Sequence, residues 1–165
     1  MYKLIHILRY FLFACLSVGS LQAQDTRWIT KNLGSGEEIY RFRIKNGLSL
    51  DILKAQFPIR FEIDWTYSQF EHLEQVSSSE LQQIRIFEEA FQQVLERQQI
   101  GIWVGGFEST KKQRWILYVK GEAEAYELVA ELKEKLPDPE FVQIYEEEDA
   151  GWKEYQELKE LIFMP

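Results

Sequence analysis

Cysteine, histidine and proline are scarce in this chain of 165 residues. It contains one cysteine, Cys15, two histidines, His6 and His72, and four prolines. One cysteine cannot close an intramolecular disulfide, and transition-metal sites usually need several His or Cys ligands. The sequence therefore predicts a domain without a metal centre or disulfides, which must be stabilised by its hydrophobic core.

The chain also lacks phosphate-binding motifs and has fewer basic than acidic residues. The chain contains neither Gly-x-Gly-x-x-Gly nor Gly-x-x-x-x-Gly-Lys-Ser/Thr, and Gly105-Gly106 alone indicates only a turn. With 19 basic and 27 acidic residues the formal charge is −8, and the basic tract at 111–114 is too small to overcome the repulsion of phosphate. We expect no cofactor, no nucleotide and no nucleic acid among the ligands.

Residues 1–23 have the composition of a secretory signal peptide. Lys3 and Arg9 precede an apolar stretch, and small residues lead to an expected cleavage after Ala23. The apolar stretch is shorter than the ~20 residues that span a bilayer, so no transmembrane anchor is expected after cleavage. The mature chain, residues 24–165, then has 142 residues, forms one domain and carries a formal charge of −10, because two basic residues are lost. Its predicted location is the periplasm or the extracellular space.

Cys15 leaves a second interpretation of this segment open. Leu12-Phe13-Ala14-Cys15 resembles a bacterial lipoprotein box, in which the cysteine is lipidated and becomes the mature N-terminus, although Phe13 departs from the usual small residue. Both interpretations place the domain outside the cytoplasm.

Hydrophobic periodicity predicts five strands and three helices. Ile39–Ile44 and Ile59–Tyr67 alternate with the period of a β-strand, and Glu62 and Asp64 lie on the polar side of the second one. Ile100–Phe107 and Arg114–Val119 are β-rich and predict a hairpin with a polar tip, in which the glycines can mark a bulge. Phe141–Tyr145 is the last strand predicted.

The predicted helices have clear start and stop signals. Ser77-Ser78-Ser79-Glu80 has the spacing of a capping box and opens a helix with an apolar stripe from Leu81 to Leu95. A second helix follows Gly121, carries inward residues from Ala125 to Leu136, and ends at Pro137. A third is opened by Asp149 and carries Trp152, Tyr155, Leu158 and Ile162 at helical spacing.

The order of these elements predicts the fold class. Without the first strand and the last helix it reads strand, helix, strand, strand, helix, strand. This is the ferredoxin-like split βαβ pattern of an α+β domain, with both helices on one face of an antiparallel sheet. The extra N-terminal strand and the C-terminal helix are expected on an edge or on the open face.

Three aromatic segments carry a resemblance to a known family. Ile102-Trp103-Val104-Gly105-Gly106-Phe107, Gln113-Arg114-Trp115-Ile116-Leu117-Tyr118 and Asp149-Ala150-Gly151-Trp152-Lys153-Glu154-Tyr155 resemble the bacterial family of domains of unknown function 695. Ala150 stands where that family has proline. The resemblance covers about Ile39 to Leu158 and implies a fold but no catalytic residues. Some relatives are similar to the protein inhibitor of endoribonuclease E, a ferredoxin-like binding module.

Few side chains are candidates for chemistry. Glu62 and Asp64 project from one side of a strand, near where Arg114 or Tyr118 would lie, and paired carboxylates can do acid/base work if burial separates their pKa values. The alternative is a sheet face with compensating charges. Trp28, in the polar N-terminal stretch, is the tryptophan expected to be exposed or to fold back over the sheet.

Two weaker candidates have simple structural explanations. His72 could act as a base for Ser77, Ser78 or Ser79, but those serines are expected to cap a helix. The acidic run 146–149 lacks the spacing of an EF-hand and is interpreted as a solvated turn before the last helix.

The expected function is a small exported binding or accessory domain without catalysis, whose sheet face or edge strand contacts a protein partner in the cell envelope. The competing hypothesis is an envelope hydrolase that uses Glu62 and Asp64 on a carbohydrate or peptide.

Overall fold

The computed structural model describes residues 27–35, 38–68, 70, 75–132, 135 and 141–164. The predicted signal peptide, His72 and the predicted helix end at Leu136 and Pro137 lie outside these residues. Ten helices and strands are found in the described part, in the order β1 (Arg27–Ser35), β2 (Glu38–Asn46), α1 (Leu50–Gln56), β3 (Ile59–Thr66), α2 (Ser78–Gln98), β4 (Gly101–Glu108), β5 (Lys112–Val119), α3 (Glu122–Leu132), β6 (Val142–Glu148) and α4 (Lys153–Phe163).

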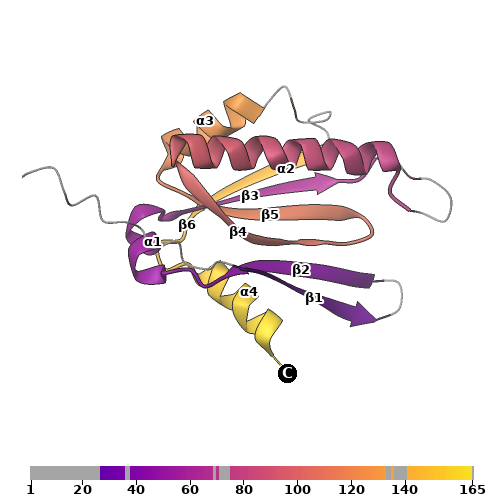
Figure 1. The fold of residues 1–165 in the computed structure, drawn as a ribbon, viewed down its shortest axis with the longest axis horizontal. Helices are drawn as coiled ribbons and strands as arrows, with labels where there is room; N and C mark the ends of the chain where they lie inside the picture. Colours follow the sequence, from indigo (N-terminus) through magenta and orange to yellow (C-terminus); the bar gives the residue numbers. More distant parts are fainter. Residues whose placement is uncertain are drawn as a thin grey trace, which may run out of the picture.

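The strands form one antiparallel sheet in the order β1-β2-β4-β5-β3-β6 (Figure 1). Its β4-β5-β3-β6 part, with α2 and α3 as connections, is the predicted ferredoxin-like unit. The expected extra strand is β2, which pairs with β4 at the edge of that unit.

Two elements were not expected from the sequence. The N-terminal stretch predicted to be only a polar lead forms β1, which pairs with β2 along its full length, from Arg27↔Asn46 to Ser35↔Glu38. The added edge is therefore a hairpin and not a single strand. Helix α1 joins β2 to β3 and is only 7 residues long, with Leu50 and Leu53 partly buried against the second core, so its apolar pattern is too short to indicate a helix.

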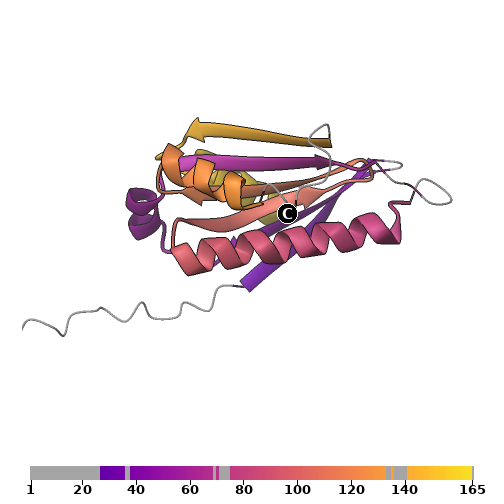
Figure 2. The same ribbon diagram turned by 90° about the horizontal axis from the view of Figure 1, so that it is seen from above.

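Helices cover both faces of the sheet, and each face has its own core. Figures 1 and 2 show α2 and α3 on one face and α4 on the other. The first core lies between the sheet and α2 and α3 and contains Trp65, Phe87, Phe91, Trp103 and Trp115. The second lies beneath α4 and contains Ile44, Ile116, Tyr118, Trp152 and Tyr155.

Helix α2 begins as the capping box predicts. The Ser77 hydroxyl accepts a hydrogen bond from the Glu80 backbone N–H at 3.2 Å, and the helical stripe from Ile84 to Leu95 is buried. Leu81, expected in that stripe, is 41% exposed, whereas Glu80 is buried. The Glu80 carboxylate accepts from the Trp65 indole at 3.1 Å and from the Ser68 N–H at 2.9 Å, so it joins the helix start to the end of β3.

A β-bulge in β4 allows α4 to approach the sheet. The register against β5 shifts between Trp103 and Gly105, as the glycines indicated. At Gly105 a Cβ atom would lie 2.8 Å from the Leu158 side chain and 2.8 Å from the Arg43 carbonyl oxygen. Glycine at this position therefore leaves room for Leu158 of α4 to pack directly on β4.

The C-terminal strand is longer than predicted. Glu146, Glu147 and Glu148, interpreted as a turn, continue β6 because they pair with Phe61, Arg60 and Ile59 of β3. Only Asp149 of the acidic run caps α4. No helix in the described ranges has the length and apolar character needed to cross a membrane.

Candidate functional site

The period of β3 places its charged side chains on the α4 side of the sheet. Phe61, Ile63 and Trp65 belong to the core beneath α2, so Glu62 and Asp64 project to the opposite face. In the register with β5, Asp64 lies directly opposite Arg114. The structure thus brings together three of the five residues expected at a site.

Asp64 is held by two cations. Arg114 donates to it in a bidentate manner, from Nε to Oδ1 at 2.5 Å and from Nη2 to Oδ2 at 2.7 Å, and Lys112 Nζ lies 2.9 Å from Oδ2. Asp64 is only 3% exposed. A buried carboxylate with this many charge-assisted hydrogen bonds is stable in its ionised form.

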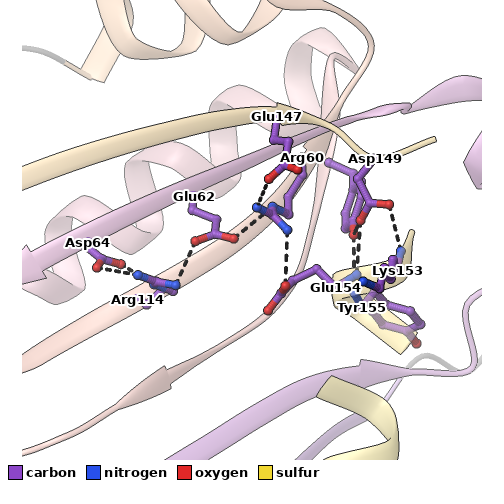
Figure 3. Close-up of polar contacts among 10 residues, drawn as sticks. Arg60, Glu62, Asp64, Arg114, Glu147, Asp149, Lys153, Glu154 and Tyr155 are labelled. Carbon is purple, nitrogen blue, oxygen red and sulfur yellow. Dashed lines mark hydrogen bonds and ion pairs between the residues drawn. The ribbon is translucent and has the colours of Figure 1, made fainter. Parts of the chain in front are cut away.

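Glu62 links this pair to a second arginine (Figure 3). Its Oε2 lies 2.9 Å from Arg114 Nη1, and its Oε1 lies 3.0 Å from Arg60 Nε. Arg60 continues to Glu147 of β6 at 2.5 Å and to Glu154 of α4 at 3.2 Å. These contacts form a continuous chain of ion pairs across β5, β3 and β6, which we call the charge ladder: Lys112, Asp64, Arg114, Glu62, Arg60, Glu147 and Glu154.

The two carboxylates have pKa values shifted in opposite directions. Burial raises the pKa of Glu62 above its ordinary value, and this effect outweighs the attraction of Arg114 and Arg60. Burial also opposes ionisation of Asp64, but the hydrogen bonds from Arg114 and Lys112 outweigh it and lower the pKa of Asp64. Separated pKa values are one requirement of an acid/base pair.

Tyr118 lies on the same face but takes part in a different set of contacts. Its hydroxyl donates to Asp149 Oδ2 at 2.6 Å, and its ring stacks on Trp152 with centroids 4.1 Å apart. Asp149 accepts in addition from the backbone N–H groups of Lys153 and Glu154, at 2.8 and 3.1 Å. Tyr118 therefore anchors the first turn of α4.

Trp28 lies on the opposite face, away from the other candidates. It belongs to edge strand β1, is 41% exposed, and packs on Trp103 with ring centroids 4.5 Å apart. It is thus both exposed and folded over the sheet. With Lys45 and Glu96 it lines a small pocket of about 80 Å³.

An open trough runs beside α4. Its floor consists of Phe42, Phe107, Arg114 and Ile116, and its wall is the flank of α4 that carries Glu154, Glu157, Glu160, Leu161 and Met164. The volume is about 400 Å³, and Arg114 also lines a neighbouring hollow over Arg60, Glu62 and Tyr145. We call the first hollow the α4 trough.

Half-buried aromatic rings make up much of the floor and its surroundings. Phe42 and Phe107 face each other across β2 and β4 with centroids 5.7 Å apart, and Tyr40 lies 5.8 Å from Phe107. The guanidinium of Arg114 lies 5.4 Å from the Phe107 ring and 5.7 Å from the Tyr145 ring. This is a mixed apolar and charged surface, of the kind found where proteins bind other proteins.

Several residues of the charge ladder were not identified as site residues from the sequence. The alternation that identified Glu62 and Asp64 also placed Arg60 on their face, so that residue could have been found. Glu147 was missed because its tract was interpreted as a turn. Glu154 reaches the charge ladder from α4, and only the packing of that helix brings it there.

The described residues contain no cluster of His, Cys, Asp and Glu that could hold a metal ion. The carboxylates of the charge ladder are directed at cationic side chains.

Comparison with protein families identifies the relatives of this chain. The family model described as Family of unknown function (DUF695) matches residues 34–158. The chain belongs to this family. No curated protein and no solved structure matches it significantly.

Two of the aromatic segments that carried the resemblance lie near the contact between α4 and the sheet. Trp103 and Gly105 lie at the bulge that brings α4 to the sheet, and the Trp103 indole donates to the Gly105 carbonyl at 2.9 Å. In the last motif, Asp149 caps α4, the Trp152 indole donates to the Phe57 carbonyl at 2.7 Å, and the Tyr155 hydroxyl donates to the Lys45 carbonyl at 2.9 Å. These motif residues fix α4 on the sheet, and that position creates the trough.

Proposed function

We propose that this DUF695 domain is a non-catalytic module, exported to the bacterial cell envelope, which binds a protein partner through the α4 trough. The observation that carries the proposal is the contrast between two adjacent surfaces. In the charge ladder both oxygens of Glu62 and of Asp64 contact cations, whereas the half-buried rings of Phe42 and Phe107 beside it line the open α4 trough. Paired ions fix a surface, and aromatic rings that line an open trough supply binding energy.

Export is supported by the sequence features of residues 1–23, namely two basic residues, an apolar stretch and a small-residue end. Lipidation at Cys15 would keep the domain outside the cytoplasm and anchor it to the membrane surface.

The test is crosslinking of the tagged protein in its own envelope, followed by mass spectrometry of the partners that co-purify. Two variants locate the surface: Phe107→Ser on the trough floor, and Trp28→Ala on the opposite face as a control. We expect a reproducible partner that is lost in the first variant and kept in the second. Recovery of the protein alone, or loss of the partner only with Trp28→Ala, contradicts the proposal.

One observation favours a hydrolase as a second candidate. Glu62 has a raised pKa and Asp64 a lowered one, which suits a proton donor and a nucleophile or base. Against it, Glu62 has only 5% of its side chain exposed, and both of its oxygens contact arginines. The hydrolase hypothesis requires turnover of an envelope glycan or peptide that Glu62→Gln abolishes while the fold persists.

A further inference from the structure

The two faces of the sheet are covered unequally. On one face α2 and α3 lie side by side, while on the other α4 packs on the sheet and the short α1 contributes only Leu50 and Leu53 to the same core (Figure 1). Helix α4 packs on β2 and β4, and its close contact is at Gly105. The sheet surface beside it, from Phe42 across Phe107 to Arg114, forms a step whose height is one helix.

The dimensions of this step favour a helix as its occupant. A helix with its side chains is about 10 Å across, so a helix placed beside α4 would form one continuous layer with it on the sheet. A single extended strand would fill only about half of that height. Helix α4 has 11 residues, so its flank is roughly 16 Å long and matches about three turns of a partner helix.

The charges beside the trough indicate which sign of charge the partner should carry. Within the charge ladder, three cations face four carboxylates, which leaves one negative charge in excess. Glu157 and Glu160 add acidic charge along the α4 flank, where Lys153 lies 3.5 Å from Glu157 on the outer side. Lys31 is held at the far end by the carbonyl oxygens of Leu161 and Met164. The chain as a whole is also acidic, with a formal charge of −8.

A second copy of the chain fits this surface poorly. In a symmetric pair, α4 of each copy would lie in the trough of the other and bring Glu154, Glu157 and Glu160 against the same three residues. Like charges placed together in an interface oppose association. A cationic partner has the complementary charge.

We propose that the α4 trough binds a cationic amphipathic helix of the partner protein, with its apolar side on Phe42 and Phe107 and its Lys or Arg side chains beside the acidic flank of α4. This inference rests on the proposed function and adds to it the shape and the charge of the bound element. Apolar anchors at helical spacing would supply the affinity, and the charges would set the orientation and the rate of association.

The experiment uses three synthetic peptides of about 12 residues with the full mature protein. The first has leucines at helical spacing and lysines elsewhere, the second has glutamate in place of every lysine, and the third has the composition of the first without helical spacing. Fluorescence anisotropy measures binding at about 50 and about 300 mM salt. We expect the first peptide to bind best and to weaken with salt.

Charge-reversal variants show where the peptide lies. The variant Glu157→Lys with Glu160→Lys is expected to weaken binding of the first peptide by about tenfold, because it reverses the flank of the trough. A control that reverses charge away from the trough is Glu89→Lys, at an exposed position of α2 on the opposite face, with an expected change below about twofold. Circular dichroism checks that each variant is folded.

Three results overturn the inference: equal binding of the glutamate peptide, equal binding of the peptide without helical spacing, or equal weakening by Glu89→Lys. The proposed function fails independently of these, when crosslinking recovers no partner. A partner that depends on Phe107 but not on Glu157 and Glu160 leaves the proposed function standing and refutes the cationic helix.

Discussion

Leu158 of α4 lies over Gly105 of β4, so closely that a Cβ atom at residue 105 would stand 2.8 Å from Leu158 Cδ2. This contact decides how near α4 comes to the sheet, and with it the shape of the trough. We expect Gly105→Ala to lower the free energy of unfolding by about 1–3 kcal/mol, as overpacking does in a tight interface. Urea denaturation followed by tryptophan fluorescence measures the loss.

The control for this variant is Gly151→Ala. Gly151 precedes α4, and its nearest neighbour would be 3.9 Å from an added Cβ atom, so the expected change is within about 0.5 kcal/mol. Equal losses from the two variants would show that both the Leu158 side chain and the Arg43 carbonyl, each 2.8 Å from the added atom, can move away from residue 105.

Asp149 makes the attachment of α4 sensitive to acid. Burial opposes its ionisation, but hydrogen bonds from Tyr118 and from the N–H groups of Lys153 and Glu154 lower the pKa of Asp149 below its ordinary value of 3.8. A lowered pKa contributes stability that is present above 3.8 and is lost as the pH falls through the pKa of the folded state.

Replacement of Asp149 tests its role as the cap of α4 and its role as the acceptor for the Tyr118 hydroxyl. At pH 7 we expect Asp149→Ala to cost about 1–3 kcal/mol, because the helix loses its cap and the Tyr118 hydroxyl loses its acceptor. The difference from the wild-type protein should shrink as the pH is lowered below about 4. Denaturation curves at pH 2 to 7 give this profile, and a pH-independent difference would be contrary to it.

The charge ladder predicts unequal costs for its two central carboxylates. The raised pKa of Glu62 means that its ionised form opposes folding at neutral pH: its contribution is fully present below the ordinary value of 4.5 and is lost as the pH rises through the folded-state pKa. The lowered pKa of Asp64 has the opposite effect, with stability present above 3.8. At pH 7, Asp64→Asn should therefore destabilise the domain more than Glu62→Gln does.

Removal of the shared cation is the more severe change. Arg114→Leu leaves Glu62 and Asp64 buried without the arginine that joins them, and we expect a loss of about 3–5 kcal/mol. Arg41→Leu is the matched control, since its ion pair with Glu108 is exposed and such pairs contribute about 0–1 kcal/mol. Similar losses from the two arginine variants would refute a structural role for the charge ladder.

Glu80 predicts a large effect at the start of α2. It is 1% exposed and accepts from the buried Trp65 indole and from the Ser68 N–H, so Glu80→Ala removes the acceptor of both donors and should cost about 2–4 kcal/mol. Glu89→Ala, at an exposed position of the same helix, should change the stability by less than about 0.5 kcal/mol. Thermal unfolding followed by circular dichroism distinguishes the two.

The sequence alone was sufficient for the fold class and for most of the elements. The alternation of β3, the apolar stripe of α2 and the hairpin of β4 and β5 are local patterns, and they predict the ferredoxin-like order without tertiary information. It also placed Glu62 and Asp64 on one face, because residues two apart on a strand always project to the same side. The aromatic motifs indicated the family.

Elements without a local pattern escaped prediction. Strand β1 is polar and becomes a strand because β2 offers it a partner, and α1 is short and has no fully buried residue. Glu146, Glu147 and Glu148 have the composition of a turn, but pairing with β3 extends β6 through them. Each of these elements depends on contacts with another segment of the chain. Its own sequence lacks a clear apolar pattern that would predict it.

The site itself was decided by tertiary structure. From the sequence, Tyr118 and Trp28 were as eligible as Arg114, yet Tyr118 anchors α4 and Trp28 lies on the other face. Strand register placed Arg114 opposite Asp64, and the packing of α4 over Gly105 brought Glu154 to Arg60. Periodicity fixes the face on which a side chain lies, whereas its partners depend on register and helix packing, which arise from contacts across the whole chain.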